Sequence, residues 1–374
     1  MRRSALGLAA IGVATSVVLA GCGSDDPVTA PAPGGNTTSA GAPSSSAPAT
    51  GKVGVILPDT ESSVRWETAD KPLLTAAFQE AGIEADIQNA QGDKGKMATI
   101  ADSMISSGVN VLIITGLDSP SAAAIQAKAK AADIKTIDYD RLTLGGSADY
   151  YVSFNNVTVG ELQGEGLIKC LGDKKPANII QLNGSPTDNN ATLFKQGAVS
   201  KLKPKYDAGD YKLVGDKAVP DWDNAQAGVI FEQLLTAADG KVDGVLAAND
   251  GLGNAAISVL KKNKLNVPVT GQDATVEGLQ NILKGDQCMT VYKEVKSEAE
   301  GAAKLAIALI KGEPGETNGE TEDTEGNRKV PSVLLDPVAI FKENVKDVID
   351  DGFVKKEDVC TADLAKACTD AGIS

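Results

Sequence analysis

Short apolar runs alternate with longer amphipathic segments from Lys52 onward. Runs of four to eight residues predict buried strands, and apolar positions spaced three and four apart predict helices. The segment 110–115, NVLIIT, is apolar throughout, as expected of a strand covered by helices on both faces. The predicted strands are 53–57, 83–87, 110–115, 134–139, 177–182, 212–219, 242–247, 267–271 and 289–293, and the predicted helices are 66–81, 94–107, 190–202, 224–238, 276–284 and 297–311, with two more after Pro120 and Asp250.

The alternation of strand and helix restarts after residue 176, so the chain contains two successive sets of similar length. A strand that is followed by a helix and a further strand favours a parallel sheet with helices on its faces. The sequence therefore predicts an α/β protein with two doubly wound, Rossmann-like lobes, each built on a parallel sheet.

The first 51 residues do not follow this pattern. Residues 1–21 combine an N-terminal basic group with an apolar stretch, as in a signal peptide. Leu19-Ala20-Gly21-Cys22 is similar to the lipobox of bacterial lipoproteins, which implies that Cys22 is lipidated; the alternative is an ordinary signal peptide with a chance cysteine. The apolar stretch is short for a membrane span of about 20 residues. Residues 22–51 are rich in Ser, Thr, Ala, Pro and Gly, which predicts a disordered tether.

Charge and residue usage exclude several classes of function. The formal net charge of −14 disfavours nucleic acid and anionic lipid surfaces as partners, which leaves the N-terminal lipid as the expected contact with a membrane. The chain has no histidine, so a Ser-His-Asp or Cys-His site and His-ligated zinc are excluded. No cofactor and no metal are expected.

Four cysteines follow Cys22, and an even number in an exported chain indicates disulfides. Cys360 and Cys368 flank a short helix-like segment and form the more plausible local pair, which leaves Cys170 for Cys288. Four free thiols remain the alternative.

Polar residues gather directly after the predicted strands. Ligands of doubly wound sheets bind at the carboxyl ends of the strands, so these clusters predict a binding site. One cluster is Asp140-Arg141 in the segment DYDR; others are 59–60, 185–190, 249–250, 272–273 and Lys293. Any one of them is also explained as a helix cap, as for Asp250 and Thr275.

The side-chain types in these clusters suit a sugar. A carboxylate accepts from two neighbouring hydroxyls, while Arg, Lys and Asn donate to hydroxyl oxygens. The apolar C–H faces of a sugar favour aromatic partners. Trp66 and Trp222, one in each set just beyond a strand end, are predicted to sandwich the ring; core packing at a helix start is the alternative for each.

Several segments together resemble the xylose-binding periplasmic proteins of bacterial ABC importers, within the ribose/galactose-binding superfamily. They are TIDYDR, YVSFNNVTVGELQG, NGSPTDNNATLF, ANDG, GQDA and MTVYK, and the resemblance covers 52 to about 358. It implies two lobes that close on one monosaccharide, xylose first, and deliver it to an ABC permease. It also implies a monomer, held by its lipid at the outer face of the cytoplasmic membrane.

The resemblance implies that the chain crosses between the lobes three times, near 147–154, 293–295 and 331–335. These three crossing segments would form a three-strand hinge. The N-terminal lobe is then 52–149 plus 295–331, and the C-terminal lobe is 150–294 plus 332–374. The implied ligand-binding residues are Arg65, Trp66, Asp140, Arg141, Asn189, Asn190, Trp222, Asn249, Asp273 and Lys293. The first loop, DTESSVRW, is less charged than the family pattern, which leaves the sugar and the role of Arg65 open.

Other classes of function fit less well. A glycoside hydrolase needs two carboxylates, for which Asp140 and Asp273 are the candidates, but Asn, Gln and Arg fill the rest of the site. A two-lobed repressor needs a basic helix-turn-helix where this chain has an export signal. A sugar sensor that presents its closed form to a chemoreceptor or kinase remains an alternative. The acidic segment 313–325 lacks the spacing of a calcium loop and is interpreted as a solvated surface loop.

Overall fold

The computed structural model describes residues 50–373, which belong to one compact unit. The predicted signal peptide, the lipidation site Cys22 and all but the last residues of the tether lie outside this range. Among the helices of residues 50–373, none is both long enough and apolar enough to cross a bilayer.

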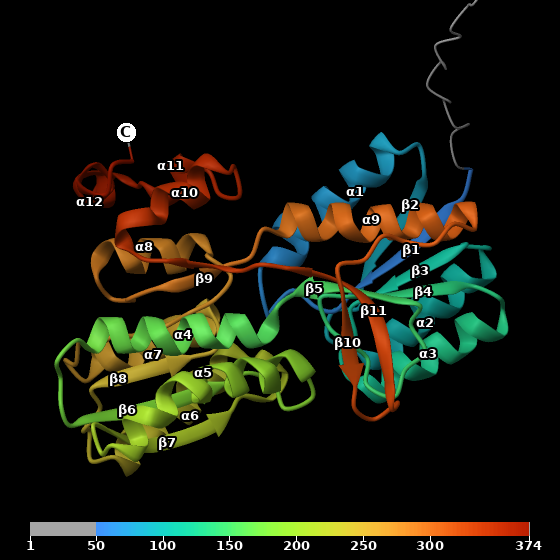
Figure 1. Ribbon diagram of the computed structural model, residues 1–374. Helices are drawn as coiled ribbons and strands as arrows, with labels where there is room; N and C mark the ends of the chain where they lie inside the picture. Colours follow the sequence, from blue (N-terminus) through green and yellow to red (C-terminus); the bar gives the residue numbers. More distant parts are fainter. Residues whose placement is uncertain (1–49, 374) are drawn as a thin grey trace, which may run out of the picture. The chain divides into compact units, whose positions relative to one another are not determined.

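The first lobe is built on a seven-stranded sheet of order β10-β11-β5-β4-β3-β1-β2 (Figure 1). All neighbouring strands run parallel except β10 and β11, which form an antiparallel hairpin. The strands are β1 (Lys52–Leu57), β2 (Glu84–Asn89), β3 (Val111–Ile114), β4 (Lys135–Tyr139), β5 (Tyr150–Phe154), β10 (Gly319–Asp323) and β11 (Arg328–Leu335).

Helices cover both faces of this sheet, as the apolar strands require. The helices α1 (Lys71–Glu80) and α9 (Val295–Lys311) bury Leu74, Phe78 and Leu305 on one face. The helices α2 (Lys94–Ser106) and α3 (Ser119–Ala131) bury Met97 and Ile125 on the other. A short π-helical turn, η1 (Trp66–Asp70), precedes α1.

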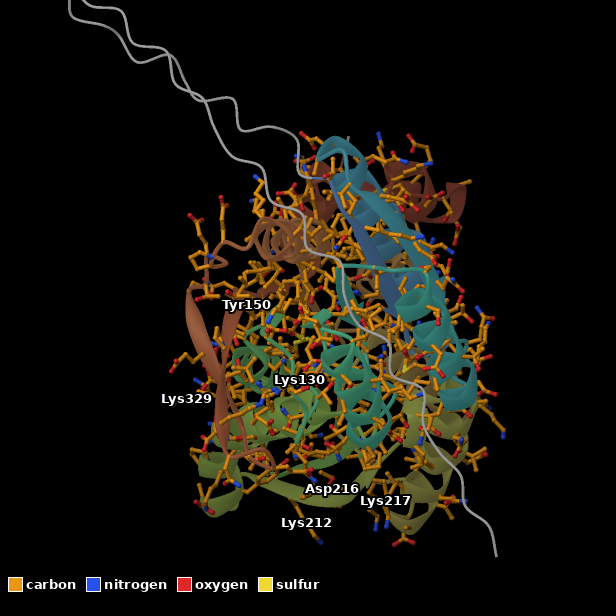
Figure 2. All side chains as sticks on the ribbon, turned by 90° about the vertical axis from the view of Figure 1, so that its right-hand side faces the viewer. Lys130, Tyr150, Lys212, Asp216, Lys217 and Lys329 are labelled. Carbon is orange, nitrogen blue, oxygen red and sulfur yellow. A yellow bond between two sulfur atoms is a disulfide. The ribbon has the colours of Figure 1, made fainter. Side chains whose placement is uncertain are left out.

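The second lobe contains a parallel sheet of order β7-β6-β8, with β6 (Ala177–Asn183), β7 (Tyr211–Ala218) and β8 (Gly244–Ala247). Figure 2 shows Lys212, Asp216 and Lys217 along β7, the edge strand. Charged side chains on such an edge oppose pairing with a further strand. A two-stranded antiparallel sheet, β9 (Thr290–Tyr292) with β12 (Val338–Ile340), completes the strands of this lobe.

The helices of the second lobe are α4 (Asn156–Leu171), α5 (Asn189–Asp207), α6 (Asn224–Ala237), α7 (Asp250–Lys262) and α8 (Val276–Lys284), with a short turn η2 (Pro220–Trp222) before α6. The helices α4 and α5 pack very closely, because glycines meet backbone there. A Cβ on Gly160 would lie 1.9 Å from the Phe194 carbonyl oxygen, and one on Gly197 would lie 2.0 Å from that of Val157. No larger residue fits at either position.

The chain ends in short helical turns that pack on α8 and β9: η3 (Lys342–Asn344), α10 (Val345–Asp350), α11 (Lys356–Val359), η4 (Ala362–Leu364) and α12 (Ala365–Asp370). Cys360 pairs with Cys368 within this tail, with the two Cα atoms 5.9 Å apart. Cys170, at the end of α4, pairs with Cys288, just before β9, with a Cα separation of 6.4 Å. These are the two pairs that the sequence predicts.

Two lobe boundaries differ from those predicted from the sequence. The strand β5 pairs with β4 and β11, so the first crossing follows Phe154 and the predicted boundary at 149 falls too early. The boundary at 331 cuts β11, which pairs with β5 as far as Leu335. The crossing near 293–295 lies between β9 and α9, where it is predicted.

Two other expectations differ from the structure. The helix α4 is absent from the predicted elements, although its residues belong to a segment on which the family resemblance rests. The segment 313–325 is not only a surface loop, because it contains β10, whose last residue is a buried carboxylate. Asp323 is fully buried and accepts from the backbone N–H of Gly145 and Gly326, both at 2.8 Å, and from Arg328 at 3.2 Å.

Candidate ligand-binding site

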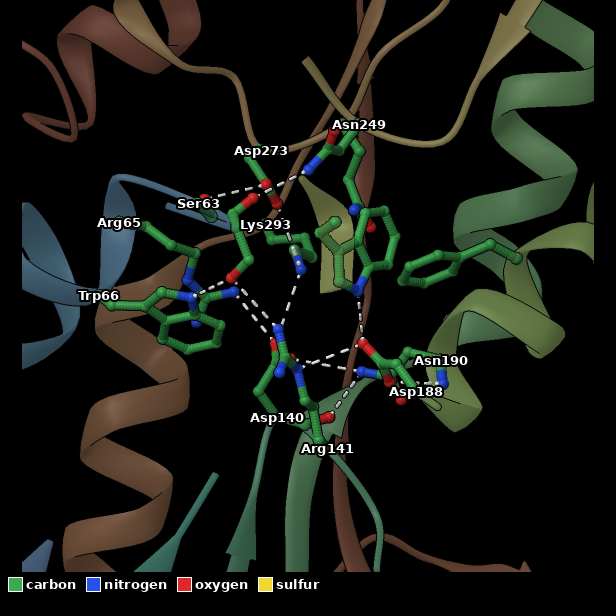
Figure 3. A pocket seen from close by; sticks show the side chains of 14 residues that line it. Ser63, Arg65, Trp66, Asp140, Arg141, Asp188, Asn190, Asn249, Asp273 and Lys293 are labelled. Carbon is green, nitrogen blue, oxygen red and sulfur yellow. Dashed lines mark hydrogen bonds and ion pairs between the residues drawn. The ribbon is translucent and has the colours of Figure 1, made fainter. Parts of the chain in front are cut away.

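A small cavity of about 30 Å³ lies where the carboxyl ends of the two parallel sheets meet (Figure 3). This volume is far below the range of about 300–1,000 Å³ for small-molecule sites, so a sugar-sized ligand needs the cavity walls to move apart. Its lining is Ser62, Ser63, Arg65, Trp66, Asp140, Arg141, Asp188, Asn190, Phe194, Trp222, Asn249, Gln272, Asp273 and Lys293.

Nine of the ten predicted ligand-binding residues line this cavity. The exception is Asn189, which is half-buried and lines a separate, smaller pocket beside Thr143 and Thr187. Asn189 is the first residue of α5, so its side chain leaves the helix in a different direction from that of Asn190. Asn189 therefore does not line the main cavity, and its role as a ligand contact stays a prediction.

The loop after β1 forms one wall of the cavity. The Asp59 carboxylate fixes this loop by accepting from the backbone N–H of Glu61 (2.9 Å) and Ser62 (2.7 Å) and from the Ser62 hydroxyl (2.8 Å). The Ser62 hydroxyl in turn accepts from Trp66 Nε1 at 3.0 Å and from Arg141 at 3.3 Å. The loop thus orients both an aromatic wall and a cation.

Arg65 is occupied by three carboxylates. Its guanidinium donates twice to Asp70, at 2.7 and 2.8 Å, once to Asp140 at 3.1 Å, and once to Glu298. Burial lowers the pKa of Arg65, but these carboxylates outweigh it and raise the pKa well above its usual value. With its donors engaged in this way, Arg65 acts on the cavity mainly by holding Asp140.

Asp140 lies at the centre of the site, and its backbone has a left-handed φ of +60°. Its carboxylate is 3.6 Å from Lys293, which is itself 3.3 Å from Asp273. Burial raises the pKa of Asp140, but Lys293, Arg65 and Arg141 outweigh it, so the pKa lies below the usual value. The carboxylate is therefore ionised at neutral pH and is an acceptor only.

The two tryptophans lie against the cavity from different lobes and are nearly buried. The guanidinium carbons of Arg65 and Arg141 lie 4.7 and 5.6 Å from the centre of the Trp66 ring system. Trp222 donates to Asp188 at 3.1 Å and packs over Gly184, where a Cβ would lie 2.0 Å from the indole. Only glycine at position 184 leaves space for this indole.

Three polar atoms of the cavity wall are buried without a hydrogen-bond partner among the described residues: Arg141 Nε, Gln272 Oε1 and Asp273 Oδ1. Arg141 Nε is 3.2 Å from Asp188 and Asp273 Oδ1 is 3.3 Å from Lys293, but neither contact has hydrogen-bond geometry. Since buried polar groups are almost always hydrogen-bonded, these three atoms have capacity to bind water or the polar groups of a ligand.

Sequence reasoning misses five cavity residues: Ser62, Ser63, Asp188, Phe194 and Gln272. Asp188 and Gln272 lie in clusters recognised after strands, so their position was a usable signal. The serines come from the loop whose sequence departs from the family, and Phe194 is indistinguishable from a core residue of its helix.

Comparison with known proteins defines the class. Residues 53–314 match the family model described as a periplasmic binding protein domain, and the chain belongs to this family. The predictions of a two-lobed α/β fold and of a binding protein that is not an enzyme are confirmed.

Individual relatives are similar over most of their length. The D-xylose-binding periplasmic proteins of Haemophilus influenzae and Escherichia coli are each 36% identical over 311 residues, which cover 82% of this chain and 92% of theirs. An ABC transporter solute-binding protein from Clostridium phytofermentans, solved with bound β-D-glucose, is 30% identical. It has a TM-score of 0.76, and the match covers 82% of this chain and 99% of that structure.

Proposed function

We propose that this protein captures a monosaccharide, with xylose as the first candidate, and delivers it to an ABC permease. The observation on which this proposal mainly depends is the set of three unpartnered polar atoms in the cavity that Trp66 and Trp222 line. Hydroxyls of one sugar ring both donate and accept, so they suit two acceptors and one donor. The C–H faces of the ring suit the indoles.

The names of the relatives support this ligand class. Two are xylose-binding proteins, and the Clostridium phytofermentans structure contains glucose. A relative from Rhizobium radiobacter, 35% identical over 327 residues, is named a multiple sugar-binding periplasmic receptor. That name favours the sensor as a second candidate, in which the closed form docks on a membrane receptor.

The ligand is held by both lobes at once. Asp140 and Arg141 come from the first lobe, Asn249 and Asp273 from the second, and Lys293 from a crossing segment. A ligand that touches both lobes stabilises the closed arrangement over an open one, and this difference drives a hinge motion.

The N-terminal segment completes the proposal. Lipidation of Cys22 would fix the chain to the outer face of the cytoplasmic membrane, and the tether 22–51 would leave the binding unit free to reach a permease. Tethering raises the effective concentration of a monomeric binding unit near its partner.

Calorimetric titration with xylose, glucose, galactose, ribose and arabinose tests the ligand class. We expect saturable one-to-one binding of xylose, weakened about tenfold or more by Asp273→Asn, which removes a charged acceptor. Asp239→Asn is the matched control, because Asp239 also has a left-handed backbone but is exposed on the second lobe. Absence of heat with all five sugars would refute the proposal.

A further inference from the structure

Three consecutive residues of the loop after β1 form hydrogen bonds with residues of the second lobe. The Ser63 hydroxyl donates to Asp273 at 3.1 Å, and the Ser62 carbonyl accepts from Asn249 at 3.2 Å. The Glu61 carbonyl accepts from Asn224 Nδ2 at 3.3 Å. Asp273 and Asn249 line the cavity, whereas Asn224 does not.

Asn224 is the first residue of α6 and is exposed, yet it has no capping role there. The backbone N–H groups of Ala225 and Gln226 are already capped by the Asp223 carboxylate, at 2.8 and 3.0 Å. The side chain of Asn224 is therefore available for the contact with Glu61 of the other lobe.

A glycine makes room for this side chain. Gly251 is the second residue of α7, and a Cβ built on it would lie 2.4 Å from Asn224 Oδ1 and 2.9 Å from Nδ2. Its φ is not in the left-handed region, so the backbone does not require glycine. Glycine is also a poor helix former, so its main local effect here is the space that it leaves for the Asn224 side chain.

We infer that Asn224, placed by Gly251, is a latch residue that keeps the loop 61–63 closed over the bound ligand without touching it. This inference rests on the proposed sugar-binding function. A contact that forms only when the lobes meet slows their separation, so it changes the rate of release (koff) and leaves the rate of entry (kon) unchanged.

Stopped-flow tryptophan fluorescence with xylose measures both rates, since the only two tryptophans of the chain line the cavity. We expect Asn224→Ala to raise koff about threefold to tenfold, as the loss of one neutral hydrogen bond predicts. Gly251→Ala should raise koff by a similar factor because it displaces Asn224. Gln233→Ala, an exposed substitution on the same helix, should leave both rates unchanged.

The double variant distinguishes a latch from a general loss of stability. If Gly251 acts through Asn224, then Gly251→Ala adds nothing to koff once Asn224 is alanine. Additive effects, or a wild-type koff in either single variant, would overturn the inference while sugar binding persists. A wild-type protein that gives no fluorescence change and no heat with any sugar would overturn the proposed function as well.

Discussion

The Trp222 indole contacts both the cavity and the hydrophobic core of the second lobe. It is only 5% exposed, and its ring centre lies 6.4 Å from that of Phe194 in an edge-to-face arrangement. Its Nε1 donates to Asp188, which lines the same cavity. The sequence leaves two alternatives for Trp222, core packing or stacking on a ligand. In the structure the side chain both packs in the core and lines the cavity.

The substitution Trp222→Ala should therefore affect two quantities. We expect the free energy of unfolding of the sugar-free protein to fall by about 3–5 kcal/mol, as for other buried aromatic residues replaced by alanine. Xylose affinity should fall about tenfold or more through loss of the aromatic contact. Denaturant unfolding and calorimetry measure the two effects. Unchanged stability with lost binding would show that the indole is a ligand contact alone.

The structural elements differ in how well their sequence predicts them. Strands such as β3, covered on both faces, are continuous apolar runs and are found directly. The strand β10 has the sequence GETED, and it becomes a strand because it pairs with β11. The segment 267–271 forms one isolated bridge, at Val269. Pro268 has no N–H to donate on one side, and on the other the Ala247 N–H donates to the Thr270 hydroxyl and not to a backbone carbonyl.

Long-range pairing explains the displaced lobe boundaries as well. The register that joins Val152 to Val333 connects positions far apart in the sequence, and no local pattern specifies it. The site was predicted more completely, because strand ends converge in this fold wherever their partners lie. The local sequence does not show which site residues contact a ligand and which only position others. Arg65 is an example, because it donates to Asp70 and Glu298, two carboxylates that do not line the cavity.

The two disulfides should contribute unequally to stability. Cys170–Cys288 spans 118 residues and ties α4 to the start of β9, whereas Cys360–Cys368 spans 8. Chain entropy predicts losses of about 5 and about 2.5 kcal/mol, respectively, when each pair is replaced by serines. Denaturant unfolding of the two double variants checks this order. A larger loss for the Cys360–Cys368 pair would contradict the entropic account.

In the molecule as a whole, the hinge and the binding site share a residue. The chain crosses between the lobes after β5, between β9 and α9, and after β11. Lys293 lies on the second crossing and contacts both Asp140 of the first lobe and Asp273 of the second. Burial lowers the pKa of Lys293, but these two carboxylates outweigh it and raise the pKa, so the ammonium stays charged. Lobe closure and assembly of the site are therefore the same event in our account.

A crystal structure of the protein with xylose tests that account most directly. We predict one sugar ring in the cavity, with hydroxyls within hydrogen-bond distance of Arg141 Nε, Gln272 Oε1 and Asp273 Oδ1, and with Trp66 and Trp222 on its two faces. Xylose bound elsewhere, or in the cavity with those three atoms still unpartnered, would contradict it.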